Sequence, residues 1–156
     1  MKKKIHMFFA AILSAMLLTA CGEDPELTQF YKNVDDFCIK VSEIDNSINN
    51  IDAESDEAVT QLLGYLDELD LVFQSFGKLD FPKEFDYLEE TAEEASEYMT
   101  TAVASYHEAY SNGSYNEYTA EYAKGNYSRA YKRIQIIISF LHGETPDDVD
   151  LVMDED

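Results

Sequence analysis

Basic residues are scarce in this sequence: 11 lysines and arginines stand against 32 aspartates and glutamates in 156 residues, a formal charge of −21. A surface this acidic repels the phosphates of nucleic acids and the headgroups of anionic lipids. We therefore expect no nucleic-acid partner and no electrostatic docking to a membrane.

The motifs that identify catalytic and metal sites are also lacking. The sequence has no glycine-rich phosphate loop and no Gly-x-Ser-x-Gly elbow. His107 and His142 belong to no Glu-x-x-His or His-Glu-x-x-His arrangement, which argues against the usual di-iron and zinc sites. Acids alternate over 52–56 as at the start of a calcium loop, but Glu57 occupies the position of the required glycine, so we interpret 52–56 as a solvated helix-capping loop. We expect no catalytic residue, no metal site and no cofactor.

The N-terminus has the features of a secretion signal. Lysines at positions 2–4 precede an almost unbroken apolar stretch from Ile5 to Leu18. This stretch is shorter than the roughly 20 residues that a membrane-spanning helix needs. It ends in the sequence Leu18-Thr19-Ala20-Cys21-Gly22. These residues resemble the lipobox of bacterial lipoproteins.

The resemblance implies a lipid anchor at Cys21. In lipoproteins the cysteine thiol receives a diacylglyceryl group, the signal peptide is cut off before it, and fatty acids such as palmitate hold the protein in the membrane. Residues 1–20 would be the signal peptide, and 21–24 the lipidated cysteine with a short linker. Removal of residues 1–20 leaves 8 basic and 32 acidic residues, a formal charge of −24. Because the acidic surface cannot dock electrostatically, the lipid would provide the anchor on the extracytoplasmic face of the cell membrane.

Cys38 is then the remaining cysteine, so no disulfide can form within the lipidated chain. An unpaired thiol outside the cytoplasm can be reactive or can pair between chains. Because Cys38 follows Phe37 on the apolar flank of a predicted helix, we expect it to be buried and inert.

Apolar residues recur at alternating intervals of three and four residues in four segments, the spacing of one side of a helix. The segments span 27–51, 59–76, 85–109 and 120–141. No segment alternates with a period of two. We therefore predict an all-α protein, an antiparallel up-down-up-down four-helix bundle over 25–143, followed by an acidic and disordered tail over 144–156.

Capping residues mark the predicted helix ends. Asp24-Pro25-Glu26 offers an N-cap acceptor and a proline at the first helical position, and Ser55 to Glu57 and Phe81 to Glu84 open the second and third helices in a similar way. Ser114 to Glu117 has the pattern of a capping box for the fourth helix. His142-Gly143 ends that helix.

The third and fourth predicted helices carry alanine at many seam positions, which lets their axes approach closely. A hairpin folded about Gly113 would bring Arg129 near Glu97 and Arg133 near Glu93. We expect Gly125 to lie inside a continuous fourth helix, at a point where that helix can kink.

Tyrosines are concentrated near the connection between the last two helices. Tyr115, Tyr118 and Tyr122 share one helix face, away from the predicted seam, and Tyr110 lies just before the connection. Exposed tyrosines suit recognition, because each ring provides contact area and each hydroxyl a hydrogen bond. In the alternative interpretation, the rings pack on the first helix or the loop and close the end of the bundle. These four tyrosines are our candidate partner-binding residues.

The patterns together favour a lipid-anchored, non-catalytic binding or accessory protein of the cell envelope, with an envelope protein or peptide as its partner. The alternative is a carboxylate-dependent hydrolase that acts on a cell-wall or sugar substrate, since glycosidases use paired acids. A pocket holding two carboxylates with raised pKa values would favour the hydrolase. A closed core with an aromatic surface patch would favour the binding protein.

Overall fold

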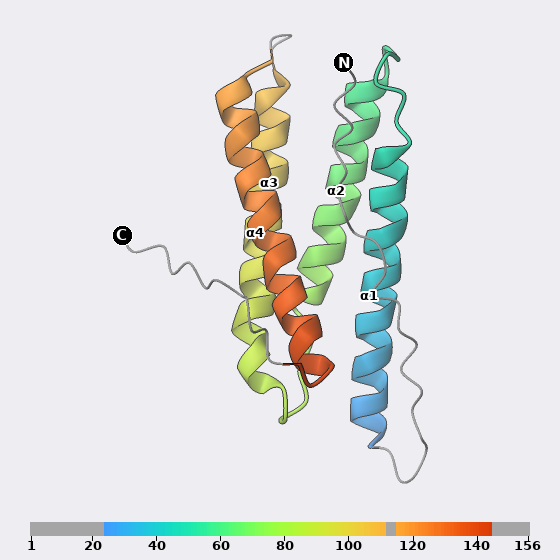
Figure 1. The fold of residues 1–156 in the computed structure, drawn as a ribbon, viewed down its shortest axis with the longest axis vertical. Helices are drawn as coiled ribbons and strands as arrows, with labels where there is room; N and C mark the ends of the chain where they lie inside the picture. The colour runs from blue at the N-terminus through green and yellow to red at the C-terminus, as the bar shows by residue number, and fades with distance from the viewer. Residues whose placement is uncertain (1–23, 112–114, 145–156) are drawn as a thin grey trace, which may run out of the picture.

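The computed structural model describes residues 24–111 and 115–144. All regular structure within these ranges is helical, and four α-helices pack together (Figure 1). The elements are α1 (Pro25–Asn49), α2 (Ala58–Phe76), the short 3-10 helix η1 (Asp86–Leu88), α3 (Glu89–Ala109) and α4 (Glu117–Leu141). The all-α prediction is confirmed. The predicted signal peptide, Cys21, the Asn112-Gly113 turn and the acidic tail beyond residue 144 lie outside the described residues.

The two outer ends of the helical region have the predicted caps. An Asp24 carboxylate oxygen accepts a hydrogen bond from the Glu26 backbone N–H at 3.0 Å, and Pro25 is the first residue of α1. At the end of α4, Gly143 has a φ of 71°, a left-handed conformation that glycine adopts without a steric cost. This turn directs the Glu144 N–H to the Ser139 carbonyl oxygen, 2.9 Å away.

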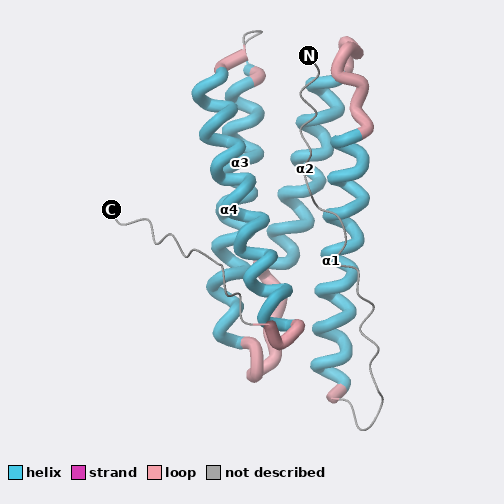
Figure 2. Tube along the Cα trace, viewed as in Figure 1, coloured by secondary structure: helices cyan, strands magenta, loops and turns pink. Residues whose placement is uncertain are grey.

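The third helix begins later than predicted, at Glu89 and not near Phe85. Phe81 and Leu88 are both buried, so the segment before α3 folds inward as a series of turns and η1. A Glu89 carboxylate oxygen accepts a hydrogen bond from the Phe81 N–H at 3.3 Å and closes this segment. Figure 2 shows the connection between α2 and α3 as a loop. Buried Phe81 therefore belongs to the connection and not to a helix.

Two predicted caps also need correction. Asn116, rather than Ser114, caps α4, because its side-chain oxygen accepts from the Thr119 N–H at 3.1 Å. The α2 N-cap is Glu57, whose side chain makes no capping hydrogen bond. The Ser55 hydroxyl accepts from the Glu57 N–H at 3.2 Å and so closes the preceding turn instead.

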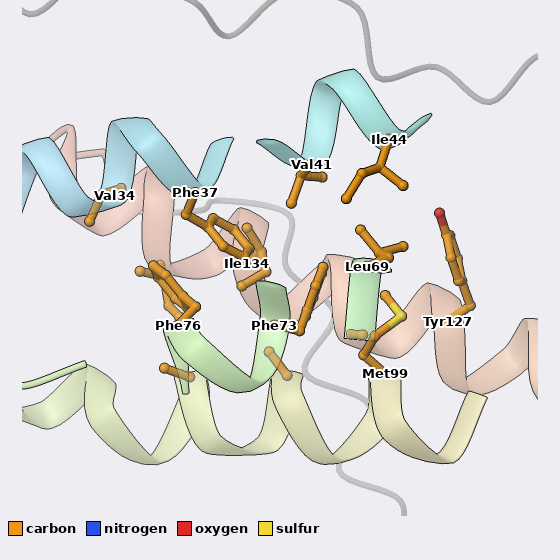
Figure 3. Close-up of a cluster of buried hydrophobic side chains, with 14 of the residues drawn as sticks. Val34, Phe37, Val41, Ile44, Leu69, Phe73, Phe76, Met99, Tyr127 and Ile134 are labelled. Atoms are coloured by element: carbon orange, nitrogen blue, oxygen red, sulfur yellow. The ribbon is translucent and has the colours of Figure 1, made fainter. Parts of the chain in front are cut away.

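The core draws side chains from all four helices (Figure 3). Rings of α1 and α2 form its centre: the Phe37 ring lies 4.2 Å from that of Phe76 and 5.3 Å from that of Phe73, centroid to centroid. Ile134 from α4 lies beside Phe37, and Met99 from α3 lies further along the core beside Leu69 (Figure 3). Val59, which fits the predicted seam of α2, is 41% exposed because the first turn of that helix extends past the core.

Helices α3 and α4 approach each other most closely of all the pairs. Many of the buried residues on these two helices are alanines. They include Ala92, Ala95, Ala102, Ala109, Ala120, Ala123 and Ala130. Small side chains allow two helix backbones to come close, so the alanine pattern explains the tight pair.

The start of α1, the α2–α3 connection and the end of α4 lie at one end of the molecule (Figure 1). The Phe30 ring of α1 lies 4.9 Å from that of Phe81 in the connection. The Tyr87 ring meets that of Phe140, near the end of α4, at 5.9 Å. The α1–α2 connection, the end of α3 and the start of α4 lie at the other end.

Candidate functional site

Tyr115, Tyr118 and Tyr122 at the start of α4 are exposed, with 59%, 86% and 55% of their surfaces accessible. We call these three residues the tyrosine face. Tyr118 and Tyr122 are one helical turn apart on α4, and Tyr115 precedes the helix. The exposure predicted for these rings is confirmed, and the alternative in which they pack on α1 does not hold for them. Their role in binding stays a prediction.

Tyr110, the fourth candidate, behaves differently. Its side chain is half-buried at the end of α3, and its ring lies 5.3 Å from that of Tyr115. Burial is the main cause that raises the pKa of Tyr110, with the neighbouring Tyr115 second. Tyr110 therefore supports one edge of the tyrosine face.

Carboxylates surround the exposed rings. Glu117 and Glu121 both lie on the exposed side of α4, one turn apart. The Lys124 ammonium lies 3.7 Å from a Glu121 oxygen, and both side chains are largely exposed. An exposed ion pair of this kind contributes little to stability, so either side chain can pair with another charge instead.

Gly125 extends the same exposed side of α4. At about 100° per residue, Gly125 is turned only about 20° from Tyr118 around the helix axis. A Cβ added at Gly125 would meet no other atom within 4 Å. As predicted, α4 is continuous through this glycine. Nothing in the packing of the described residues requires glycine at this position.

An arginine, a tyrosine and a glutamate meet further along the α3–α4 pair. The Arg133 Nε donates to a Glu94 oxygen at 3.0 Å, and its guanidinium carbon lies 5.1 Å from the centre of the Tyr98 ring. Arg129 also lies over Tyr98, at 5.7 Å. The predicted partner of Arg133 was Glu93, so that prediction is wrong by one residue. The proximity of Arg129 to Glu97 stays a prediction. The hairpin register differs by one position, and one residue on a helix turns a side chain by about 100°.

A buried carboxyl group lies between α1 and α4. Asp45 on α1 is only 5% exposed. Its Oδ1 accepts from the Tyr127 hydroxyl at 3.0 Å and from the Tyr131 hydroxyl at 2.9 Å. The two tyrosine rings stack at 4.8 Å, and Figure 3 shows the Tyr127 hydroxyl pointing from α4 toward α1. We call these three residues the Asp45 cluster.

The Asp45 cluster was not predicted, although the sequence carries a signal for it. Asp45 stands four residues after Val41 and three before Ile48, which is the spacing of core positions. Its charge alone favours a solvated position, because aspartate is almost never buried without a partner. The partners are tyrosines 82 and 86 residues away in sequence.

Burial governs the titration of the cluster. It raises the pKa of Asp45, and the hydrogen bonds from Tyr131 and Tyr127 lower that pKa by a smaller amount. Burial is also the largest cause that raises the pKa values of Tyr127 and Tyr131, so both hydroxyls keep their protons and act as donors. The cluster is a polar link between helices, and its carboxyl group is closed to substrates.

Cys38 is a free, half-buried cysteine on α1. Burial, with a smaller contribution from the charge of Asp35, raises the pKa of its thiol to about 11. Since the thiolate is the nucleophilic form, the thiol is unreactive at neutral pH. This agrees with the inert cysteine that we expected, but the side chain is half-buried and not fully buried.

Two kinds of feature are absent from the described residues. Over residues 24–111 and 115–144, no three His, Cys, Asp or Glu side chains are grouped so that they could hold a metal ion. No helix in the same part of the chain has both the length and the apolar composition to cross a membrane. Comparison of the chain with protein-family models, curated proteins and solved structures found no match.

Proposed function

We propose that this chain is the precursor of a bacterial lipoprotein, and that its helical region is a non-catalytic binding or accessory module of the cell envelope. The observation that carries the proposal is the exposure of Tyr115, Tyr118 and Tyr122 on adjoining turns. Clusters of exposed aromatic rings mark interaction sites more often than isolated ones do. The lipobox that ends in Cys21 supplies the anchor and the extracytoplasmic location.

The proposed architecture is an antiparallel up-down-up-down bundle. Contacts between neighbouring helices support it, because residue numbers rise in one helix as they fall in the next. Asp67 contacts His107 and Asp70 contacts Thr100 across α2 and α3, at 2.7 Å and 2.6 Å. The same rule holds across α3 and α4, where Glu94 contacts Arg133 and Tyr98 contacts Arg129.

This architecture orients the tyrosine face away from the membrane. Only Gly22, Glu23 and Asp24 separate Cys21 from α1. The end of the bundle where α1 begins would therefore lie at the membrane. A 25-residue helix is about 37 Å long, so the tyrosine face at the opposite end would be presented outward.

The hydrolase alternative receives less support. A glycosidase needs two carboxyl groups on either side of a bond in a substrate cleft. Asp45 has a raised pKa, but it is 5% exposed and its oxygens accept from two tyrosines. A sugar cannot reach this group without separating α1 from α4.

The proposal is tested by replacing Tyr115, Tyr118 and Tyr122 together with serine in a strain that makes the protein at its normal level. We expect crosslinking in intact cells to lose the partner captured by the parent. Helicity and melting temperature should stay nearly unchanged, because the exposed rings contribute little to the core.

Tyr87→Ser is the matched control, since Tyr87 is 57% exposed at the opposite end of the molecule. It should retain the partner. Retention of the partner by the triple variant would refute the role of the tyrosine face. A large drop in its melting temperature would show that the rings belong to the core.

A further inference from the structure

We propose that the tyrosine face binds a basic peptide segment of its partner, whose arginine or lysine side chains lie on the rings and pair with Glu117 and Glu121. This inference rests on the proposed function and specifies the chemistry of the partner. Four features of the described residues carry it: ring exposure, surrounding charge, an internal Arg–Tyr–Glu contact and the vacant space above Gly125.

The rings provide the contact area. Tyr118 is 86% exposed, so both faces of its ring are open to a ligand. Tyr115 is held at 5.3 Å from the half-buried Tyr110, which fixes its position before binding. The face of a tyrosine ring is electron-rich and attracts cations.

The charges select the sign of the ligand. Glu121 lies one turn from Tyr118 on α4. Glu117 directly precedes Tyr118 in the sequence, so carboxylates flank the rings. The whole chain adds a formal charge of −21. An acidic ligand, an anionic lipid surface or a second copy of this chain would be repelled, whereas a basic segment would be attracted.

The molecule already contains the contact that we propose. Arg133 lies over the Tyr98 ring at 5.1 Å while its Nε donates to Glu94 at 3.0 Å. Glu94 and Tyr98 are one helical turn apart on α3. Tyr118 and Glu121 are likewise neighbours on adjacent turns of α4. Their spacing is three residues and their order is reversed, so an arginine from a partner would reach a ring and a carboxylate on α4 in a related arrangement, not an identical one.

Gly125 leaves space for the backbone of the ligand. Glycine inside a helix is less favourable than alanine. No atom lies within 4 Å of an added Cβ there, so packing does not account for this glycine. Gly125 lies about one turn beyond Tyr122 on the same exposed side of α4, so a peptide main chain can approach the helix next to that ring.

The test measures the affinity of labelled peptides for the protein purified from membranes in detergent. One peptide is a fourfold repeat of Arg-Gly-Ser, and the matched peptide replaces each arginine with citrulline, which has the same shape and no charge. We expect the arginine peptide to bind and the citrulline peptide to bind at least about tenfold more weakly. Binding should weaken as salt increases.

Variants separate the tyrosine face from the general acidity. Replacing Tyr115, Tyr118 and Tyr122 with serine should weaken arginine-peptide binding about tenfold. The double variant Glu117→Gln and Glu121→Gln should weaken it about threefold to fivefold. The control is Glu90→Gln with Glu93→Gln, which removes two exposed carboxylates from α3 and should change affinity less than about twofold.

The inference would be overturned if the Glu117/Glu121 and Glu90/Glu93 double variants lost equal affinity for the arginine peptide, because binding would then follow total charge. Unchanged binding by the tyrosine variant would overturn it for the same reason. Equal affinity for the citrulline peptide would overturn it as well. Sedimentation showing a dimer that the tyrosine variant loses would also overturn it, since a second copy would then occupy the face.

If the tyrosine variant loses its cellular partner but still binds the arginine peptide normally, the inference fails and the proposed function stands. If it loses neither, both fail.

Discussion

Asp45 places a carboxyl group inside the contact between α1 and α4, where burial raises its pKa. The folded protein therefore holds this proton more strongly than the unfolded chain does. Stability from this group is present in full below the unfolded pKa and is lost as pH rises through the folded pKa. Two tyrosine donors reduce the cost of the charged form without removing it.

Replacing Asp45 with asparagine tests this linkage. Asparagine is neutral at every pH and can still accept from Tyr127 and Tyr131. We expect Asp45→Asn to have a higher free energy of unfolding than the parent at pH 8, and the difference to shrink toward pH 4, as the parent carboxyl gains its proton. Urea unfolding followed by circular dichroism at several pH values measures it.

Tyr131→Phe is the companion variant. It removes a donor that favours the charged form of Asp45, so its destabilisation should be larger at pH 8 than at pH 4. A difference between parent and Asp45→Asn that is constant across this range would show that Asp45 has the same pKa in the folded and unfolded states.

Among the elements, Gly77 at the end of α2 and Gly125 inside α4 have different surroundings. A Cβ added at Gly77, just after α2, would lie 2.8 Å from the Ser96 Cβ and 3.1 Å from the Ala92 carbonyl oxygen. Gly77 therefore permits a close approach of α2 to α3. Gly125 inside α4 has open space around it.

Two alanine variants should accordingly have opposite effects. Gly125→Ala should stabilise the protein by about 0.5–1 kcal/mol, because alanine loses less backbone entropy in a helix. Gly77→Ala should destabilise it by about 1–3 kcal/mol through overpacking. Thermal and urea unfolding of both variants measure these changes. Equal effects of the same sign would contradict the packing described for the two sites.

The burial of side chains from different helices gives a testable prediction for the core. Phe37 on α1 and Ile134 on α4 are 6% and 3% exposed, and each contacts the other helices through the central layer. Phe37→Ala and Ile134→Ala should each lower the free energy of unfolding by about 2–5 kcal/mol. Leu71→Ala is the control, since Leu71 is 63% exposed on α2 and should change stability little. Melting curves of the core variants that match the parent would contradict the core assignment.

For the whole molecule, the proposed lipid anchor and the helical fold are separate. Cys21 precedes the described residues, and α1 begins at Pro25 with its own cap from Asp24. We therefore expect Cys21→Ser to release or mislocalise the protein while the helical region keeps its circular dichroism spectrum and melting temperature. Cell fractionation with a high-salt wash measures the location. A variant that still fractionates with the membrane after this wash would contradict the lipobox interpretation.

The sequence by itself determined the features that depend on neighbouring residues. Helical spacing predicted the α-helices, Asp24 and Gly143 marked their outer ends, and the alanines predicted the close α3–α4 pair. The exposure of Tyr118 and Tyr122 also followed, because the period of a helix decides which side chains point away from the seam.

Only the tertiary structure decided the features that depend on distant residues. The late start of α3 follows from the burial of Phe81 and Leu88 against other helices. The choice of Glu94 over Glu93 as the partner of Arg133 depends on a one-residue register between two helices. Asp45 is buried because α4 supplies hydroxyl donors from 82 and 86 residues away. Local patterns carry no information about such partners, because a buried polar group is stable only once the fold has brought its donors into contact.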